Sequence, residues 1–114
     1  MHELALARDL LATIELKLEP HDSRVVRVRV SVGTAAGIVC EALRFAFRVI
    51  AEGTRVEGAE LLITPVPARS RCADCAATFA FEGLIGRCPG CGRLGGELLA
   101  GDELVLRSIE VTDV

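Results

Sequence analysis

Four cysteines in two closely spaced pairs constrain this chain more than any other feature. The pairs are Cys72-Ala-Asp-Cys75 and Cys88-Pro-Gly-Cys91, with twelve residues between them. Each C-x-x-C pair places two thiolates within reach of one metal ion, and Gly90 and Gly92 permit the tight backbone that lets amide groups approach the sulfurs. Four sulfur ligands without a competing histidine predict a tetrahedral zinc site.

A closed four-sulfur site is structural, because it leaves no open position for a water nucleophile. The segment from Ala73 to Arg93 is rich in glycine and holds few large apolar side chains, so it needs an ion to become ordered. The alternatives are a rubredoxin-like iron centre for electron transfer, which uses the same four sulfurs, and a redox-active dithiol pair. Metal analysis of the purified protein separates zinc from iron.

The composition is that of a folded protein rather than a disordered one. The chain has 114 residues, of which 51% are apolar, and a formal net charge of −3, so its bulk charge does not suggest a polyanionic partner. We expect no membrane association, because no signal-like start and no apolar run of membrane-spanning length is present. Four of the cysteines have the spacing of metal ligands rather than of a disulfide framework. This usage favours a location in the reducing cytoplasm.

Two helices are predicted from apolar residues that recur at spacings of three and four. The first begins directly after Glu3 and ends at Pro20. Its apolar stripe is Leu4, Ala7, Leu11, Ile14 and Leu18. The second spans 41–52 and is closed by Gly53. Its apolar face is Leu43, Ala46, Phe47 and Ile50.

Three strands are also predicted. In the first, Val26, Val28, Val30 and Val32 alternate with polar residues, which is the period of a strand with one buried and one wet face. The others span 59–64 and 103–111. The last strand needs a partner, and the nearest sheet lies before the cysteines. A separate C-terminal zinc domain with its own hairpin is the alternative, but it would leave an apolar strand edge unpaired.

These elements predict an α+β fold in which two helices pack on a small three-stranded sheet and a zinc-ribbon-like loop is inserted. The main α/β domain comprises residues 1–67 and 95–114, and the zinc-binding domain comprises residues 68–94. Gly95, Gly96 and Gly101 allow the chain to return from the loop to the sheet.

The start of the chain offers a second set of metal ligands. The amino nitrogen of Met1 and the amide and imidazole nitrogens of His2 can close successive chelate rings, and the Glu3 amide can supply a fourth nitrogen. Such ligands suit square-planar Ni(II) or Cu(II) rather than zinc. The spacing alone equally fits the commoner case, an exposed histidine without a ligand role.

Six motifs then follow one another in a specific order and spacing. They are Met1-His2-Glu3-Leu4, the valine strand ending at Gly33, Glu41-Ala-Leu-Arg-Phe-Ala-Phe47, Glu57-Gly-Ala-Glu-Leu61, the paired cysteines, and Ile109-Glu-Val111. In this order, over essentially its whole length, the chain resembles the HypA/HybF family of hydrogenase nickel-incorporation proteins.

The resemblance implies a small metallochaperone that helps deliver nickel to the large subunit of NiFe hydrogenase, or in some organisms to urease, beside a HypB-type GTPase. It implies transient Ni(II) binding at Met1, His2 and Glu3. It implies structural Zn(II) at Cys72, Cys75, Cys88 and Cys91. We expect no enzyme activity, since no nucleophile has a recognisable base beside it.

Some residues depart from the family pattern or carry a second interpretation. Cys40 stands where relatives commonly have the proline that opens the second helix, and we expect it to act as a small apolar residue rather than a fifth ligand. The turn from Gly33 to Gly37 lacks the acidic residue often seen after its first glycine. His21 is expected to be a solvated turn residue, with a secondary nickel contact as the alternative.

A zinc-ribbon module that binds nucleic acid or protein, without delivering nickel, is the other functional class. Arg69, Arg71, Arg87 and Arg93 surround the cysteine pairs, but Asp74, Glu82 and Glu97 partly balance them. The chain has no Trp and no Tyr for base stacking. Because phosphate binding needs a concentrated positive face, we expect no nucleic-acid partner.

Overall fold

The computed structural model of the protein describes residues 2–112, and its chain divides into two compact units. The first unit comprises Met1–Val30, Ile38–Ile63 and Leu106–Val114. The second comprises Ser31–Gly37 and Thr64–Val105. The segment expected to bind zinc, residues 68–94, therefore lies entirely within the second unit, which also takes in residues on either side of it.

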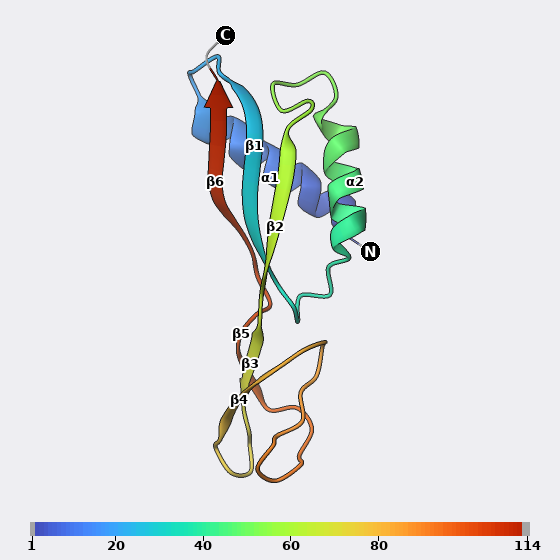
Figure 1. Ribbon diagram of the computed structural model, residues 1–114, viewed down its shortest axis with the longest axis vertical. Helices are drawn as coiled ribbons and strands as arrows, with labels where there is room; N and C mark the ends of the chain where they lie inside the picture. Colours follow the sequence, from blue (N-terminus) through green and yellow to red (C-terminus); the bar gives the residue numbers. More distant parts are fainter. Residues whose placement is uncertain (1, 113–114) are drawn as a thin grey trace. The chain divides into compact units, whose positions relative to one another are not determined.

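The first unit contains the predicted helices and most of the predicted sheet (Figure 1). Its helices are α1 (Glu3–Leu18) and α2 (Cys40–Ala51), which pack against each other. Its sheet has the order β2-β1-β6, formed by β1 (Arg24–Gly33), β2 (Glu60–Val66) and β6 (Leu104–Thr112). β1 and β2 run in the same direction with α2 between them in the chain, and β6 runs in the opposite direction (Figure 1). The predicted return of the last strand to the earlier sheet is confirmed.

The core of this unit is formed by the helices, β1 and the segment that precedes β2. Its largest fully buried side chains are Ile14, Val28, Val30, Leu43, Phe47 and Val56. Burial of each such side chain stabilises the fold by roughly 1.5–3 kcal/mol. Neither described helix is long and apolar enough to cross a membrane.

The buried side of α1 is only partly the predicted one: Ala7 and Ile14 belong to the expected stripe, but Leu10 does not. Ala7, Leu10 and Ile14 are buried, whereas Leu4 is 46% exposed. The helix is rich in leucine, so spacings of three and four fit more than one stripe, and contacts with the rest of the unit decide between them. The stripe that is buried continues back to Glu3, which is only 6% exposed.

The valine alternation in β1 holds from Val28 onward, where Val28, Val30 and Val32 are all buried. Before that point the prediction was wrong, since Val25 is buried and Val26 is not. Ser31, expected on the wet face, is also buried.

On the polar face of the sheet, Arg27 of β1 joins both neighbouring strands. Its guanidinium donates to Glu60 of β2 at 2.9 Å and to Glu110 of β6 at 2.8 Å. Arg29 also donates to Glu110. The three strands are thus linked by ion pairs on the face opposite the buried valines, although exposed pairs of this kind contribute only modestly to stability.

The second unit contains a small sheet that the sequence did not predict. Its order is β4-β3-β5, formed by β3 (Ala68–Arg71), β4 (Thr78–Phe81) and β5 (Glu97–Ala100), and both outer strands are antiparallel to β3. Each strand has only four residues, which is too short for alternation to stand out from the surrounding loops.

The chain returns from this sheet through glycines, as expected. Gly95, Gly96 and Gly101 all have positive φ. The returning segment is bonded to the end of β1 and the residues after it. The Gly101 carbonyl accepts a hydrogen bond from the Ala35 amide at 2.8 Å, and the Gly33 amide donates to the Glu103 carbonyl at 2.8 Å. A Cβ placed on Gly33 would lie 2.0 Å from the Gly101 carbonyl oxygen, so no side chain fits there.

Gly33→Ala is therefore expected to destabilise the second unit by about 3 kcal/mol, because the new methyl group meets backbone that cannot move aside as a side chain could. Gly83→Ala is the matched control in the same unit. At Gly83 φ is +89° and no atom lies near the added Cβ, so only about 1 kcal/mol of backbone strain is expected. Urea unfolding of the metal-loaded protein compares the two variants. Equal losses would contradict the close approach at Gly33.

Candidate metal centre

The second unit brings together the four cysteines that the sequence singled out. The sulfur atoms of Cys72, Cys75, Cys88 and Cys91 all lie within 4.8 Å of one another. Cys72 and Cys91 approach to 3.5 Å between sulfurs, and Cys75 and Cys88 approach to 3.6 Å. Four Zn–S bonds of about 2.3 Å in a tetrahedron place sulfurs about 3.8 Å apart. The cluster therefore fits one four-coordinate ion.

The first cysteine pair is held by a turn at the end of β3. The Ala76 amide donates to the Cys72 carbonyl at 3.0 Å, and the Cys72 amide donates to the Ala77 carbonyl at 2.8 Å. This turn requires a positive φ at its fifth residue, and Ala76 has φ of 63° there. A non-glycine residue in this conformation is strained by roughly 1–2 kcal/mol.

The second pair repeats the same pattern. The Gly92 amide donates to the Cys88 carbonyl at 2.8 Å, and the Cys88 amide donates to the Arg93 carbonyl at 2.9 Å. Gly92, with φ of 81°, occupies the position that Ala76 occupies in the first turn. The expected approach of an amide to a sulfur is confirmed at Gly90, whose N–H donates to the Cys88 sulfur at 3.4 Å. Two equivalent turns thus present four thiols to one point.

The cluster is half enclosed by the small core of this unit. Cys72 and Cys88 are buried beside Phe79, with Ala77 and Phe81 packed against them. Cys75 and Cys91 are exposed. Across the outside, Arg93 reaches back from the second turn to Asp74 in the first, with an N–O distance of 3.0 Å. Each turn therefore contributes one inner and one outer sulfur.

Backbone hydrogen bonds and neighbouring thiols give the four cysteines different pKa values. Hydrogen bonds from the backbone amides of Cys75 and Asp74 lower the pKa of Cys72 to about 7. The pKa of Cys88 is also lowered, chiefly by the Cys91 amide. The Arg93 amide acts to lower the pKa of Cys91, but the Cys72 thiol beside it, burial and the other thiols raise it to about 12. Four sulfurs this close cannot all ionise unless a cation neutralises them.

Arginines near the cysteines are engaged with other groups of the second unit. Besides the Arg93 contact with Asp74, Arg71 donates to Glu97 at 2.8 Å, and Arg87 donates to the Gly92 carbonyl at 2.8 Å. Arg71 and Arg93 are thus paired with carboxylates, whereas Arg87 keeps its charge.

The structure places two of the three N-terminal residues predicted to bind nickel, and Met1 lies outside the described residues. His2 is exposed and precedes α1, and its imidazole makes no capping hydrogen bond to the helix. Glu3 begins α1. Its carboxylate accepts a hydrogen bond from the Val39 amide at 2.9 Å, directly before α2. The Glu3 side chain thus joins the starts of the two helices.

Two other residues considered from the sequence lie away from the cysteine cluster. Cys40 is half-buried, begins α2 in the first unit and is not among the clustered cysteines. His21 is exposed, and its carbonyl accepts a hydrogen bond from Arg55. The strained conformation of Ala76 could not be predicted from the sequence, because it depends on how the turn folds.

Comparison with known proteins gives consistent matches over the whole chain. The family described as "Hydrogenase/urease nickel incorporation, metallochaperone, hypA" matches residues 1–111. A hydrogenase maturation factor HypA from Beijerinckia indica is 41% identical, with 97% of this chain and 99% of the relative covered. A second, from Desulfitobacterium hafniense, is 39% identical, with 99% and 100% covered.

Solved structures agree in fold. The solution structure of the Ni metallochaperone HypA from Helicobacter pylori matches with a TM-score of 0.67 at 24% identity, and all of both chains is covered. Another, described as the solution structure of HypA protein, matches with a TM-score of 0.63 at 26% identity, covering 98% of this chain and 97% of the other. The likeness in fold therefore extends over essentially the whole chain.

Ala76→Gly is expected to stabilise the metal-loaded second unit by about 1 kcal/mol, because glycine adopts the left-handed conformation without the strain that alanine carries. Thermal unfolding and the rate of metal loss to a chelator measure the effect. Ala73→Gly in the same turn, where φ is not positive, is the control and should bring no gain. A loss of stability in Ala76→Gly would show that the turn is not strained.

Metal uptake is expected to release protons. At pH 7 the thiols of Cys75 and Cys91, whose pKa values are raised, are protonated, so zinc binding releases two or more protons. Affinity for Zn²⁺ therefore falls as the pH is lowered. Titration of metal-free protein with Zn²⁺ in weakly buffered solution containing a pH indicator counts the protons. Uptake without proton release would mean that the four thiols are not the ligands.

Proposed function

The chain belongs to the HypA family of nickel-incorporation metallochaperones, which are maturation factors rather than enzymes, and we propose that it delivers Ni(II) for assembly of a NiFe hydrogenase. In this proposal the cargo binds at the N-terminus and a structural Zn(II) holds the second unit. A HypB-type GTPase and the hydrogenase large subunit are the proposed partners, with urease as a further recipient. The cytoplasm is the proposed compartment.

The observation that carries the nickel assignment is the position of His2 directly before α1. The first four amide groups of a helix have no acceptor within the helix, so the nitrogens at this end are not committed to the helical ladder. The His2 imidazole is likewise exposed and makes no helix-capping bond. Together with the amino group of Met1, these nitrogens form the chelating set that square-planar Ni(II) prefers.

Glu3 has a divided role in this proposal. Its amide nitrogen belongs to the chelating set, while its carboxylate is held by the Val39 amide. That hydrogen bond, together with burial of the side chain, fixes where the first turn of α1 begins. We therefore assign the Glu3 carboxylate to positioning the chelate rather than to binding the metal.

Zinc is the proposed resident of the cysteine cluster, with Cys72, Cys75, Cys88 and Cys91 as its ligands. Four thiolates satisfy a tetrahedral zinc ion completely, so the site can hold shape but cannot activate water. Iron accepts the same donors, and metal analysis distinguishes the two.

Delivery requires a site that releases its metal. Nitrogen ligands at an exposed terminus regain protons as the pH falls, and a partner with better ligands can displace them one at a time. Four thiolates that enclose one ion leave no open coordination position at which a partner's ligand could begin to displace them. The N-terminal site is thus suited to metal transfer, and the cysteine site is suited to stabilising the fold.

His2→Ala is expected to abolish tight nickel binding while the zinc content stays at one ion per chain. The loss in nickel affinity should exceed the roughly 10–100-fold that removal of an outer-shell partner costs, because a ligand and its chelate ring are lost. Nickel titration of untagged, zinc-loaded protein, followed by absorbance, measures it. Unchanged affinity would overturn the assignment of His2.

Two controls belong with this experiment. His21→Ala removes the other histidine, and unchanged nickel affinity in this variant would exclude the secondary contact considered from the sequence. A residue added before Met1 converts the amino group into an amide and should weaken nickel binding without altering zinc. If the extended protein bound nickel as tightly as the native one, the terminal amine would not be a ligand.

A further inference from the structure

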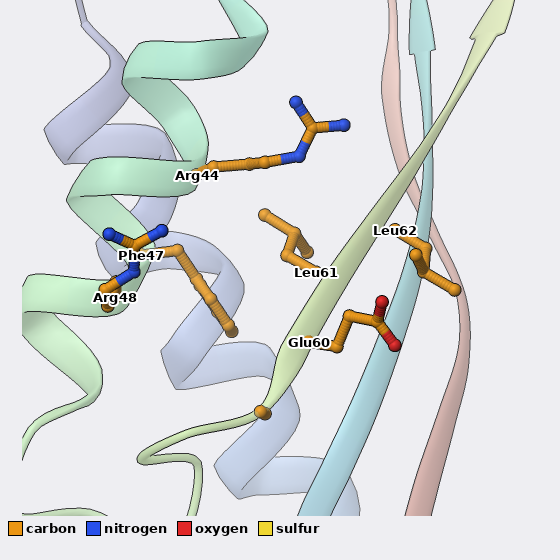
Figure 2. A pocket seen from close by; sticks show the side chains of 7 residues that line it. Arg44, Phe47, Arg48, Glu60, Leu61 and Leu62 are labelled. Atoms are coloured by element: carbon orange, nitrogen blue, oxygen red, sulfur yellow. The ribbon is translucent and has the colours of Figure 1, made fainter.

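A groove in the first unit lies between α2 and β2, away from the residues assigned to either metal. It has a volume of about 300 Å³. Its lining residues are Arg44, Phe47, Arg48, Ala59, Glu60, Leu61 and Leu62. Figure 2 shows Arg44 reaching from α2 toward β2, with Phe47 and Leu61 between the two elements. The groove therefore has an apolar floor and a basic rim.

The groove follows an open edge of the sheet. β2 pairs only with β1 in the order β2-β1-β6, so the backbone groups along its other side have no strand partner within residues 2–112. Leu61 is buried, whereas Glu60 and Leu62, its neighbours along the strand, point to the other face. Residues from both faces of β2 line the groove, so the groove extends around the open edge of this strand. An open strand edge is a template for an added strand.

The two arginines of the rim are not neutralised. Arg44 and Arg48 are exposed and have no ion-pair or hydrogen-bond partner in the described part of the chain, unlike Arg27 and Arg29 of the adjacent strand. Two free cations beside an apolar groove, on a chain whose net charge is −3, favour an anionic occupant at this place. Glu60 does not cancel them, because it is paired with Arg27 at 2.9 Å.

The spacing of the arginines matches an extended chain. Residues four apart in a helix are separated by about 6 Å along the axis. In a strand, side chains on the same face are separated by about 6.6 Å. Two acidic residues separated by one other residue would therefore lie opposite Arg44 and Arg48 together.

From this geometry we propose that the groove between α2 and β2 binds an extended acidic segment of a partner protein. The segment adds to the edge of β2 as a strand and directs alternate carboxylates to Arg44 and Arg48. Pro65, which lacks an amide hydrogen, limits the pairing to the earlier part of β2. The inference does not rest on nickel binding, since no proposed metal ligand lines the groove.

The test uses a fluorescent synthetic peptide in which aspartate alternates with threonine, titrated with the zinc-loaded full chain and followed by anisotropy. The wild-type protein is expected to bind it. The double variant Arg44→Glu, Arg48→Glu should bind at least about tenfold more weakly, equivalent to about 1.4 kcal/mol, because both attractions become repulsions. Arg8→Glu is the matched control, since Arg8 is exposed on α1 outside the groove and should leave binding unchanged.

Two further peptides separate strand addition from simple charge attraction. A version with lysine in place of aspartate should not bind, and a version N-methylated along the edge that pairs with β2 should lose most of its affinity. Both use the wild-type protein, so they remain decisive if the double variant fails to fold. Equal binding by wild type and double variant, undiminished binding of the methylated peptide, or no binding of the parent peptide would each overturn the proposal.

Self-association is examined in the same preparations by sedimentation. If the wild type were a dimer and the double variant a monomer, the groove would be occupied by a second copy of the chain, and the proposal would be wrong. A monomeric wild type that binds the acidic peptide supports it. Nickel titration of the double variant should match the wild type, so failure of this proposal leaves the metal assignments standing.

Discussion

The convergence of four cysteine sulfurs is the constraint on which the second unit depends. Its buried core cluster consists of Cys72, Cys88 and Phe79, and two of these three residues are proposed metal ligands. Three short strands and so small a core cannot offset the conformational entropy of the long loops between them. An ion bound by all four thiolates closes both turns at once, which makes metal binding part of the folding free energy.

The first unit is organised by packing instead, and this difference suits the two roles proposed for the metal sites. Its core is made of large aliphatic side chains and Phe47, so it needs no ion. The register of α1 against that core buries Glu3 and leaves His2 exposed. A nitrogen site at this point stands on a stable helix but remains open to solvent and to partners.

Much of this arrangement could be predicted from the sequence, because its signals are local. The spacing of the cysteines, the valine alternation and the helix ended by Pro20 each specify an element without reference to the rest of the chain. The return of β6 to the main sheet followed from the need to pair an apolar strand. The resemblance to the HypA family is confirmed by the whole-chain comparisons, whereas the N-terminal ligand set stays a prediction.

What the sequence did not show depends on contacts between distant residues. The predicted stripe of α1 includes the buried Ala7 and Ile14 but misses the buried Leu10, because periodicity in a leucine-rich helix fits more than one stripe. The β4-β3-β5 sheet escaped prediction because each strand is four residues long. The strain at Ala76 depends on the conformation of its turn. The hydrogen bond of the Glu3 carboxylate depends on the Val39 amide, which is distant in the sequence.

We propose that one chain holds two metals in unlike environments, a thiolate cage and a nitrogen chelate. X-ray absorption at the zinc and nickel edges, on untagged protein loaded with both metals, distinguishes these environments. Four sulfur neighbours are expected around zinc, and only nitrogen or oxygen neighbours around nickel. Sulfur in the nickel shell, or loss of sulfur from the zinc shell when nickel is added, would contradict this proposal.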